Sequence, residues 1–357
     1  MKAVRQRTRA AEETLAAYTT LRLGGPAERI VVANTDRDAV AAVREAARSG
    51  APVLVLAGGS NVVISDDGFP GTVILLRTRG IGESRDGDLV RLSVAAGEPW
   101  DDVCAVAVAA GWAGVECLSG IPGSTGATPI QNVGAYGQEV AETLAAVRVY
   151  DRVRDEVVVL PPEACGFGYR TSVFKHNDRF LVLAVDFRLA AAPLSAPIRY
   201  AELARTLDVP VAGRAPLAQV RAAVLGLRAG KGMVLDAGDP DTSSVGSFFT
   251  NPVLDGPAFA ALRQRAASLG EPPAWPGADG QVKVSAAWLI ERAGYGKGYG
   301  APGTGVAISG KHTLALTNRG AGTTRALLDL ARDVRAGVHG QFGVLLEPEP
   351  VLVGCEL

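Results

Sequence analysis

Cysteine and histidine are scarce in this chain of 357 residues, which holds four cysteines and three histidines. No two cysteines form a C-x-x-C pair, and no histidines stand at a metal-ligand spacing. A chain of this length does not need disulfides to hold its core, and a thiolate metal site lacks a set of ligands. We therefore predict no bound metal and four free, mostly buried thiols in a reducing compartment: Cys104, Cys117, Cys165 and Cys355.

Long apolar runs and a strong net charge are also missing. No run approaches the roughly 18 apolar residues that cross a bilayer. Residues 1–18, MKAVRQRTRAAEETLAAY, carry charges throughout and lack the apolar centre of a signal peptide. The net charge is −1, and there is no basic block typical of nucleic-acid-binding proteins. We expect a cytoplasmic protein with neither nucleic acid nor membrane as a partner.

What is present is an ordinary globular composition, 48% apolar and 20% charged. A chain this long exceeds one hydrophobic core, so two or three domains are expected. The segment 35–50 illustrates the local signals: Thr35 can cap a helix, Asp38 stands at the capping-box position, and Gly50 ends it. Further helices are expected at 98–111, 216–232, 256–269, 283–294 and 322–338. Strands are expected at 52–61 (its first part), 71–77, 145–152, 155–160, 180–189, 305–309, 313–317 and 343–347.

Two glycine-rich loops stand out in the N-terminal half. The first, LAGGSNVVI (56–64), follows a strand, and the second, LSGIPGSTGATPIQNVGAYGQEV (118–140), has no regular periodicity. Loops of this length are usually functional, and small residues let backbone N–H groups approach an anion such as a pyrophosphate. Neither loop carries the dinucleotide fingerprint G-x-G-x-x-G between a strand and a helix, and neither is a P-loop.

The stretch SVGSFFTNP (244–252) places the hydroxyl of Ser247 beside Phe248 and Phe249. Gly-Ser and Asn-Pro both mark turns, so a turn serine next to two core aromatics is one interpretation. A functional hydroxyl held by the two aromatics is the other. The stretch alone leaves both open.

Several motifs together resemble the UDP-N-acetylenolpyruvoylglucosamine reductase (MurB) family, type I. AGGSNVVISDDGFPGTVI and the second glycine loop look like its two flavin-contacting loops, and TTLRLGGPA (19–27) resembles its N-terminal flavin segment. The remaining matches follow in the family's order along nearly the whole chain: GFGYRTSVFK, GSFFTNP, KVSAAWLIERAG, KHTLALTN and FGVLLEPEP.

The resemblance implies an α+β fold and a flavin chemistry. The FAD-binding part, of the vanillyl-alcohol-oxidase-like (PCMH) type, would comprise two α/β subdomains at 1–78 and 79–236, and 237–357 would form a C-terminal α/β substrate-binding domain. The family reduces the enolpyruvyl ether of UDP-N-acetylglucosamine to UDP-N-acetylmuramate. NADPH is the co-substrate, and FAD, here expected to be non-covalent, carries the hydride.

Three residues match the family's catalytic positions. Ser247 matches the proton donor, Arg170 the arginine that stabilises charge near the enolpyruvyl carboxylate, and Glu349 the catalytic glutamate. A carboxylate beside an enolate is repulsive unless it is protonated, so a raised pKa is expected for Glu349. Glu347, in the same motif, does not match the catalytic position. Pro350 departs from the branched residue expected there.

Other positions match the family's binding sites. The substrate-binding matches are Tyr169, Tyr200, Lys231, Asn251 and His312, with Tyr200 in the type I tyrosine loop near 196–210. The cofactor-binding matches are Leu23, Gly24, Gly58, Gly59, Ser60, Asn61, Gly123, Ser124, Thr125, Gly126, Gln131, Asn132, Gly134 and Ala135.

Two other function classes remain as alternatives. An alcohol oxidase or dehydrogenase of the same fold is the first, although covalent flavoproteins carry a histidine where this chain has Asn61. A non-catalytic flavin- or nucleotide-sugar-binding module is the second. Such a module has no need of a proton donor, so Ser247 together with Arg170 and Glu349 argues against it.

Overall fold

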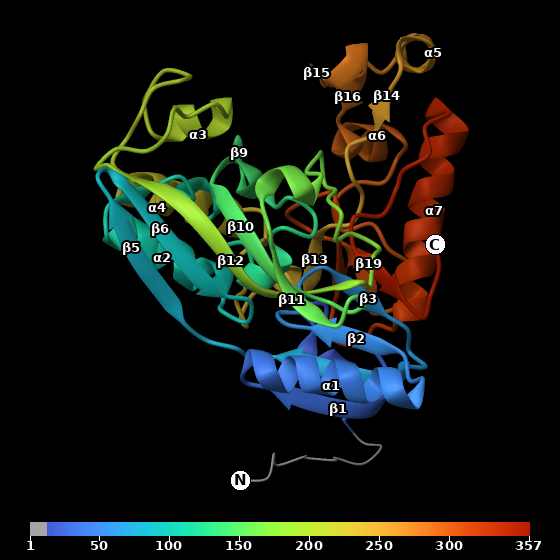
Figure 1. Ribbon diagram of the computed structural model, residues 1–357. Helices are drawn as coiled ribbons and strands as arrows, with labels where there is room; N and C mark the ends of the chain where they lie inside the picture. Colours follow the sequence, from blue (N-terminus) through green and yellow to red (C-terminus); the bar gives the residue numbers. More distant parts are fainter. Residues whose placement is uncertain (1–12) are drawn as a thin grey trace. The chain divides into compact units, whose positions relative to one another are not determined.

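The computed structural model describes residues 13–357, which form two compact units (Figure 1). Unit 1 holds Ala27–Gly59 and Phe69–Val234 with Glu13, and unit 2 holds Thr14–Pro26, Ser60–Gly68 and Leu235–Leu357. The charged stretch that argues against a signal peptide lies largely outside the described residues. The assignment of flavin and substrate roles to separate domains stays a prediction.

A parallel sheet in the order β1-β4-β2 opens unit 1. Strands β1 (Ala27–Ala33) and β2 (Val53–Leu56) both pair with β4 (Phe69–Leu76), and helix α1 (Asp36–Ser49) connects β1 to β2. Figure 1 shows α1 lying along this sheet. Parallel strands need such a connection because a tight turn cannot join them. The predicted helix at 35–50 and the predicted strands in the first part of 52–61 and at 71–77 are confirmed, whereas β1 was not predicted.

The ends of α1 follow the predicted signals. The Thr35 hydroxyl accepts from the Asp38 amide at 3.1 Å, and the Thr35 amide donates to the Asp38 carboxylate at 3.1 Å. Gly50 ends the helix in the left-handed conformation, with φ 69°. Local sequence therefore determines this helix at both ends.

An antiparallel sheet in the order β11-β10-β12-β6-β5 forms the larger part of unit 1. Its strands are β5 (Ile81–Asp86), β6 (Leu89–Ala95), β10 (Leu144–Asp151), β11 (Glu156–Leu160) and β12 (Phe180–Ala191), with β7 (Trp112–Ala113) pairing to β12. Strands β10, β11 and β12 were predicted. The β5–β6 hairpin was missed, although the Asp86-Gly87 dipeptide at its turn is a hairpin signal.

Three helices and a small hairpin complete the regular structure of unit 1. The helices are α2 (Trp100–Ala109), α3 (Ala201–Thr206) and α4 (Leu217–Ala229), and the hairpin joins β8 (Gly134–Ala135) to β9 (Gln138–Glu139). Helices α2 and α4 were predicted, whereas α3 lies in the predicted tyrosine loop and was not.

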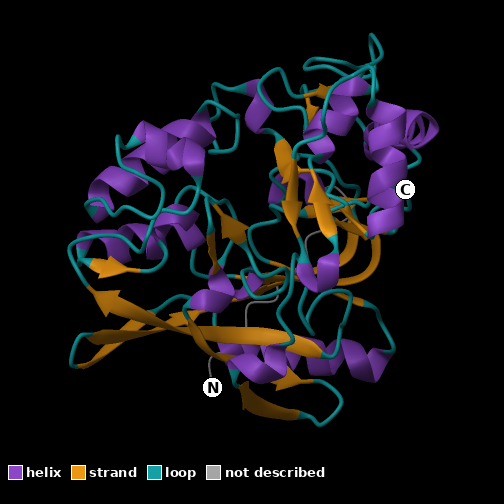
Figure 2. Cartoon of the chain, turned by 90° about the horizontal axis from the view of Figure 1, so that it is seen from above, coloured by secondary structure: helices purple, strands orange, loops and turns teal. Residues whose placement is uncertain are grey.

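Unit 2 combines short strands with three helices, and much of the chain in Figure 2 is loop. Its strands are β3 (Val62–Ile64), β13 (Ser244–Ser247), β14 (Val253–Leu254), β15 (Ala274–Pro276), β16 (Val282–Val284), β17 (Val306–Ile308), β18 (Ala315–Asn318) and β19 (Val351–Val353). They pair as β13-β18-β17, β14-β16-β15 and β19-β3. The helices are α5 (Gly256–Ala266), α6 (Ala286–Arg292) and α7 (Thr324–Phe342), all at predicted places.

Helix α7 carries the core of unit 2. Four buried residues share its inner face: Leu327, Ala331, Val334 and Val338. Its first amides, at Thr324 and Arg325, donate to the carboxylate of Asp66 at 2.8 and 2.9 Å. The segment Ser60–Gly68 is thereby joined to a helix more than 250 residues later in the sequence.

The predicted strand at 343–347 is wrong. Gly343 ends α7 with φ 71°, and residues 343–347 form no strand. Pro348 and Pro350 lack backbone donors, so this part of the chain cannot build a continuous ladder. The terminal strand is instead β19, in parallel register with β3.

Candidate active site

The two glycine loops meet inside unit 1. A Cβ atom added to Gly58 would lie 2.5 Å from the Cα of Gly123, closer than any side chain tolerates. One added to Gly126 would lie 2.5 Å from the Cβ of Ala96. Glycine is required at both places because backbones approach each other directly. Gly59 continues the first loop with φ 59°.

The second loop is anchored by its backbone. The amides of Thr125 and Gly126 donate to the carbonyls of Glu98 and Ala96, each at 2.8 Å. Thr125 and Gln131 are buried, and so is Ser124, whose hydroxyl has no hydrogen-bond partner among residues 13–357. A buried hydroxyl without a partner in its own chain indicates a place for a polar ligand atom.

Asn132 connects the second loop to the turn that carries Arg170. Its Nδ2 donates to the Glu139 carboxylate at 2.8 Å and to the Gly168 carbonyl at 3.2 Å. Its Oδ1 accepts from the Ala141 amide at 3.0 Å. These three hydrogen bonds engage the side chain within the protein, which limits its predicted role as a flavin contact.

Arg170 lies against the same loop. Its guanidinium donates to the Gly134 carbonyl at 2.8 Å and to the Asn132 carbonyl at 3.4 Å. The guanidinium stands 5.5 Å from the ring centre of Tyr169. Arg170 and Asn132 adopt positive φ angles of 52° and 44°, conformations that cost free energy in residues other than glycine. Such positions cluster at functional sites. Ala135 follows Gly134 in β8.

Tyr200 and Lys231 come together around Tyr136. The rings of Tyr136 and Tyr200 meet edge to face at 5.4 Å, and the Lys231 ammonium lies 5.6 Å from the Tyr136 ring centre. Lys231 also pairs with Glu202 of α3 at 2.8 Å. Partial burial opposes the ammonium charge, but the hydrogen bond to Glu202 prevails and raises the pKa of Lys231.

Ser247 ends β13 in unit 2, just after a bulge. Ser244 pairs with Thr317, but three residues later Ser247 pairs with Ala315, so β13 carries one extra residue there. Gly246 absorbs the bulge with φ 76°. Phe248 and Phe249 are buried, as predicted, with ring centres 5.1 Å apart. The Ser247 hydroxyl makes no hydrogen bond within the described part of the chain.

Glu349 is placed beside this turn by the backbone. Its amide donates to the Phe248 carbonyl at 2.8 Å, and the Thr250 amide donates to the Glu347 carbonyl at 3.0 Å. Ser247 and Glu349 therefore flank one short antiparallel contact. The Glu347 side chain is 64% exposed and pairs with Arg335 at 3.5 Å.

Other flavin-loop matches in unit 2 have structural contacts. The Asn61 carbonyl accepts from the Val351 amide at 3.1 Å, and Ser60 begins this segment. Leu23 is buried in the core of unit 2. Gly24 has φ 127°, and a Cβ there would lie 3.1 Å from the Cβ of Ile64. These positions shape unit 2 whether or not they also touch a cofactor.

Asn251 and His312, two predicted substrate contacts, lie at loop ends in unit 2. The side-chain Oδ1 of Asn251 accepts from the Ala286 amide at 2.9 Å, which satisfies the first amide of α6. The His312 amide donates to the Ser309 hydroxyl at 3.1 Å. Neither side-chain role toward a substrate is tested by these contacts.

Within unit 1 the structure gathers Arg170 with the second loop and Tyr200 with Lys231, and within unit 2 it gathers Ser247 with Glu349. Sequence reasoning missed Glu202 and the buried Arg228, whose Nε has no partner among the described residues. Burial lowers the pKa of Arg228. The spacing of Lys231 and Arg228 at helical i and i+3 was the available signal.

Residues of unit 1 fit an FAD molecule. Gly58 and Gly123 allow the close backbone approach that a pyrophosphate needs, and Ser124 offers a buried hydroxyl with no partner among the described residues. These three residues with Thr125 would hold the cofactor. Their side chains are too small to obstruct it.

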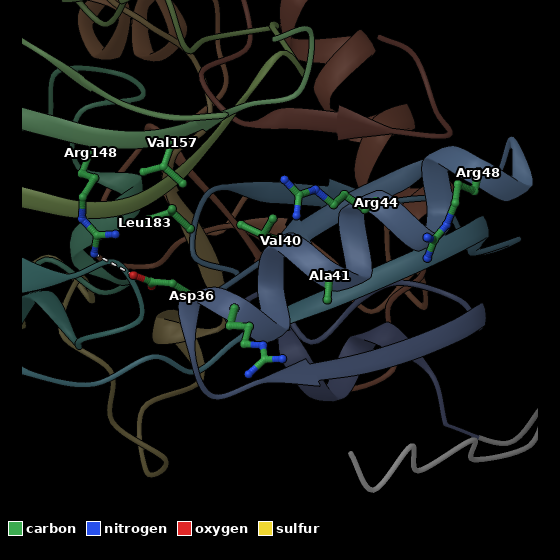
Figure 3. Close-up of a pocket in the computed structure, with 9 residues that line it drawn as sticks. Asp36, Val40, Ala41, Arg44, Arg48, Arg148, Val157 and Leu183 are labelled. Atoms are coloured by element: carbon green, nitrogen blue, oxygen red, sulfur yellow. Dashed lines mark hydrogen bonds and ion pairs between the residues drawn. The ribbon is translucent and has the colours of Figure 1, made fainter. Parts of the chain in front are cut away.

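A separate hollow of about 460 Å³ lies between α1 and the antiparallel sheet of unit 1 (Figure 3). Four arginines, one aspartate and four apolar residues line it: Asp36, Arg37, Val40, Ala41, Arg44, Arg48, Arg148, Val157 and Leu183. Arg148 pairs with Asp36 at 2.6 Å, and Arg44 pairs with Asp155 at 2.6 Å. None of the predicted site residues lines this hollow.

The described residues contain no group of three or more His, Cys, Asp or Glu side chains that could hold a metal. All four cysteines are free, as predicted. Burial raises the pKa of Cys165 to about 11 and shifts the other three thiols in the same direction. No described helix is both long and apolar enough to cross a membrane.

Comparisons with known proteins match this arrangement. A family model described as "UDP-N-acetylenolpyruvoylglucosamine reductase, C-terminal domain" matches residues 239–353, and another, "FAD binding domain", matches residues 27–160. The UDP-N-acetylenolpyruvoylglucosamine reductase of Salinispora arenicola is 64% identical over 97% of this chain and 96% of its own length. That of Thermobifida fusca is 57% identical over 96% and 97%.

A solved structure agrees. The MurB enzyme of Thermus caldophilus covers 97% of this chain and 99% of its own, with 26% identity and a TM-score of 0.66. The predicted α+β flavoprotein fold is confirmed. The chain belongs to the UDP-N-acetylenolpyruvoylglucosamine reductase family.

Proposed function

We propose that this chain reduces UDP-N-acetylglucosamine enolpyruvate to UDP-N-acetylmuramate, a step of peptidoglycan precursor synthesis, with NADPH as reductant and non-covalent FAD. Family membership supports the reaction. The observation that carries the assignment of residues is the Ser247 hydroxyl, which has no hydrogen-bond partner among residues 13–357 and lies one residue from the Phe248–Glu349 backbone bond. A hydroxyl that makes no hydrogen bond to the described residues supports a role for Ser247 as proton donor.

Bound FAD supplies hydride transfer from NADPH to C3 of the enolpyruvyl group. Ser247 donates the proton that C2 requires. A serine hydroxyl is a weak acid, so neighbouring donors must stabilise the alkoxide that remains. Arg170 stabilises the negative charge that develops on the enolpyruvyl acid group, and a protonated Glu349 hydrogen-bonds to the substrate acid.

The other assignments follow the same proposal. Lys231, Tyr200, Tyr169, Asn251 and His312 bind the UDP-sugar. A lysine ammonium suits a diphosphate because it is a compact point charge. The protein acts as a monomer in the cytoplasm.

The test is an anaerobic stopped-flow experiment on the purified protein. NADPH should bleach the flavin absorption, and the enolpyruvyl substrate should then restore it, with UDP-N-acetylmuramate identified by mass spectrometry. Denaturation should release free FAD. Flavin that remains covalently attached, or reoxidation that is no faster with substrate than without it, would reject the proposal in favour of another flavoenzyme class.

A further inference from the structure

The carboxylate of Glu202 is paired with the ammonium that is assigned to the substrate. Glu202 lies in α3, two residues after Tyr200, and its Oε2 accepts from the Lys231 Nζ at 2.8 Å. Glu202 is the one hydrogen-bonding partner of the Lys231 side chain among the described residues. Both side chains are partly exposed, at 36% and 29%, so a ligand in solution can reach the pair.

The surroundings of the Lys231–Glu202 pair favour binding of a further anion. Lys231 is close to Tyr136, and the buried Arg228 belongs to the same charge group, since both cations act on the Tyr136 hydroxyl. Desolvation is the largest influence there and raises the pKa of Tyr136. Arg228 contributes a buried Nε with no partner among the described residues. Asp101 also acts on Arg228, but both of its oxygens accept from Arg221, at 2.6 and 2.9 Å, so Glu202 is the carboxylate that pairs with Lys231.

We propose that Glu202 is a displaceable counter-ion, which holds Lys231 when no substrate is bound and yields it to the diphosphate of the UDP-sugar. This inference rests on the proposed function, because it takes the ligand of Lys231 to be a diphosphate. Glu202 acts through Lys231 and determines how tightly the diphosphate binds.

Charge explains why the two anions exclude each other. A carboxylate that stayed 2.8 Å from Lys231 would repel a diphosphate bound to the same ammonium. Binding must therefore break one ion pair to form another, so part of the attraction between Lys231 and the diphosphate is offset. A partly exposed ion pair corresponds to a change in affinity of at most about fivefold.

The experiment measures the dissociation constants of UDP and of uridine by calorimetry for four forms of the holoenzyme: wild type, Glu202→Gln, Lys231→Met and the double variant. Glu202→Gln should bind UDP about two- to fivefold more tightly and uridine unchanged. In the Lys231→Met background the same substitution should have no effect, because the pair is already broken. Glu202→Ala should repeat the result, and thermal unfolding identifies a variant that fails to fold.

Glu142 supplies the matched control. It pairs with Arg199 at 3.0 Å and is 40% exposed, so Glu142→Gln removes the same charge from a similar ion pair nearby in unit 1. UDP affinity should not change. If Glu142→Gln also bound UDP more tightly, and by the same factor, the effect would be one of net charge and the inference would be overturned. Weaker UDP binding in Glu202→Gln and Glu202→Ala would overturn it as well.

Wild-type turnover separates this inference from the proposed function. If the wild type turns over normally but Glu202→Gln binds UDP no more tightly, only the counter-ion role of Glu202 is rejected. Absence of turnover with the enolpyruvyl substrate rejects the proposed function. Absence of UDP binding to the wild type overturns the counter-ion whatever the turnover, because Lys231 then has no diphosphate to receive.

Discussion

In unit 1 three polar candidate side chains are held by hydrogen bonds or ion pairs within their own unit, whereas in unit 2 Ser247 is placed by its backbone. Arg170, Asn132 and Lys231 each contact neighbouring carbonyls or carboxylates. The Ser247 hydroxyl makes no hydrogen bond to a described residue, and a bulge with a left-handed glycine determines its position.

This difference predicts different outcomes of substitution. A side chain that also supports its neighbours cannot be removed without a cost in folding free energy. A side chain placed by backbone pairing can be truncated with its surroundings intact. Function and stability should therefore separate cleanly at Ser247 and remain coupled at Arg170, Asn132 and Lys231.

Ser247→Ala should give the largest effect. Phe248 and Phe249 still pack, so the melting temperature and FAD content should stay at the wild-type level. NADPH should still reduce the flavin, but reoxidation by the enolpyruvyl substrate should slow by about 10²–10⁴-fold, because the general acid is gone. Stopped-flow absorbance measures both half-reactions.

Thr250→Ala is the control for Ser247→Ala. Its hydroxyl lies in the same turn and makes only a long bond of 3.4 Å to the Glu347 carbonyl. Both half-reactions should proceed at wild-type rates. Wild-type reoxidation in Ser247→Ala would show that the proton comes from another group.

Arg170→Lys should come next. A lysine cannot reproduce the planar fork that donates to the Gly134 and Asn132 carbonyls. Reoxidation by substrate should fall by about 10–10²-fold, with a smaller effect on flavin reduction. The exposed Arg91, changed to lysine in the same sheet-rich unit, should leave both rates unchanged. Equal losses in both half-reactions would make Arg170 a structural residue.

Asn132→Ala tests the coupling expected for unit 1. The substitution removes three hydrogen bonds and places alanine at φ 44°, so the free energy of unfolding should fall by about 1–3 kcal/mol. Asn177→Ala, at an exposed turn with comparable bonds, should cost less than about 0.5 kcal/mol. Chemical denaturation measures both. A loss of activity without a loss of stability would instead favour direct contact with the flavin.

The smallest effect concerns pH. Hydrogen bonds from Arg179 lower the pKa of Asp151 from 3.8 to about 2. The ion pair therefore stabilises the fold fully above pH 3.8, and this contribution is lost as the pH falls toward 2. Melting temperatures of wild type and Arg179→Met should differ at pH 7 and converge near pH 2. A constant difference over this range would contradict the assignment.

Local signals predicted much of the fold and failed where distant segments decide. The capping box of α1 and the apolar face of α7 are written in consecutive residues, and both are confirmed. The stretch 343–347 has the apolar composition of a strand, yet it begins with a left-handed Gly343 and is followed by Pro348 and Pro350. The strands β3 and β19 are too short to recognise without each other.

The candidate site was predictable by residue type and less so by role. Motif matches located Ser247, Arg170 and Glu349. They did not reveal that the Asn132 side chain donates to the Gly168 carbonyl, or that Glu202 pairs with Lys231. Each of these contacts joins residues about thirty positions or more apart. Such pairings depend on how loops fold back on each other, which no local pattern records.

The interleaving of the two units has a consequence for synthesis on the ribosome. The segments Thr14–Pro26 and Ser60–Gly68 emerge early, but the helix that Asp66 caps and the strand that pairs with β3 emerge last. Unit 1 has all of its described residues by Val234, whereas unit 2 must wait for Val353. During that interval β3, with its three buried apolar residues, lacks its native neighbour, so the nascent chain offers an unpaired strand to chaperones or to aggregation.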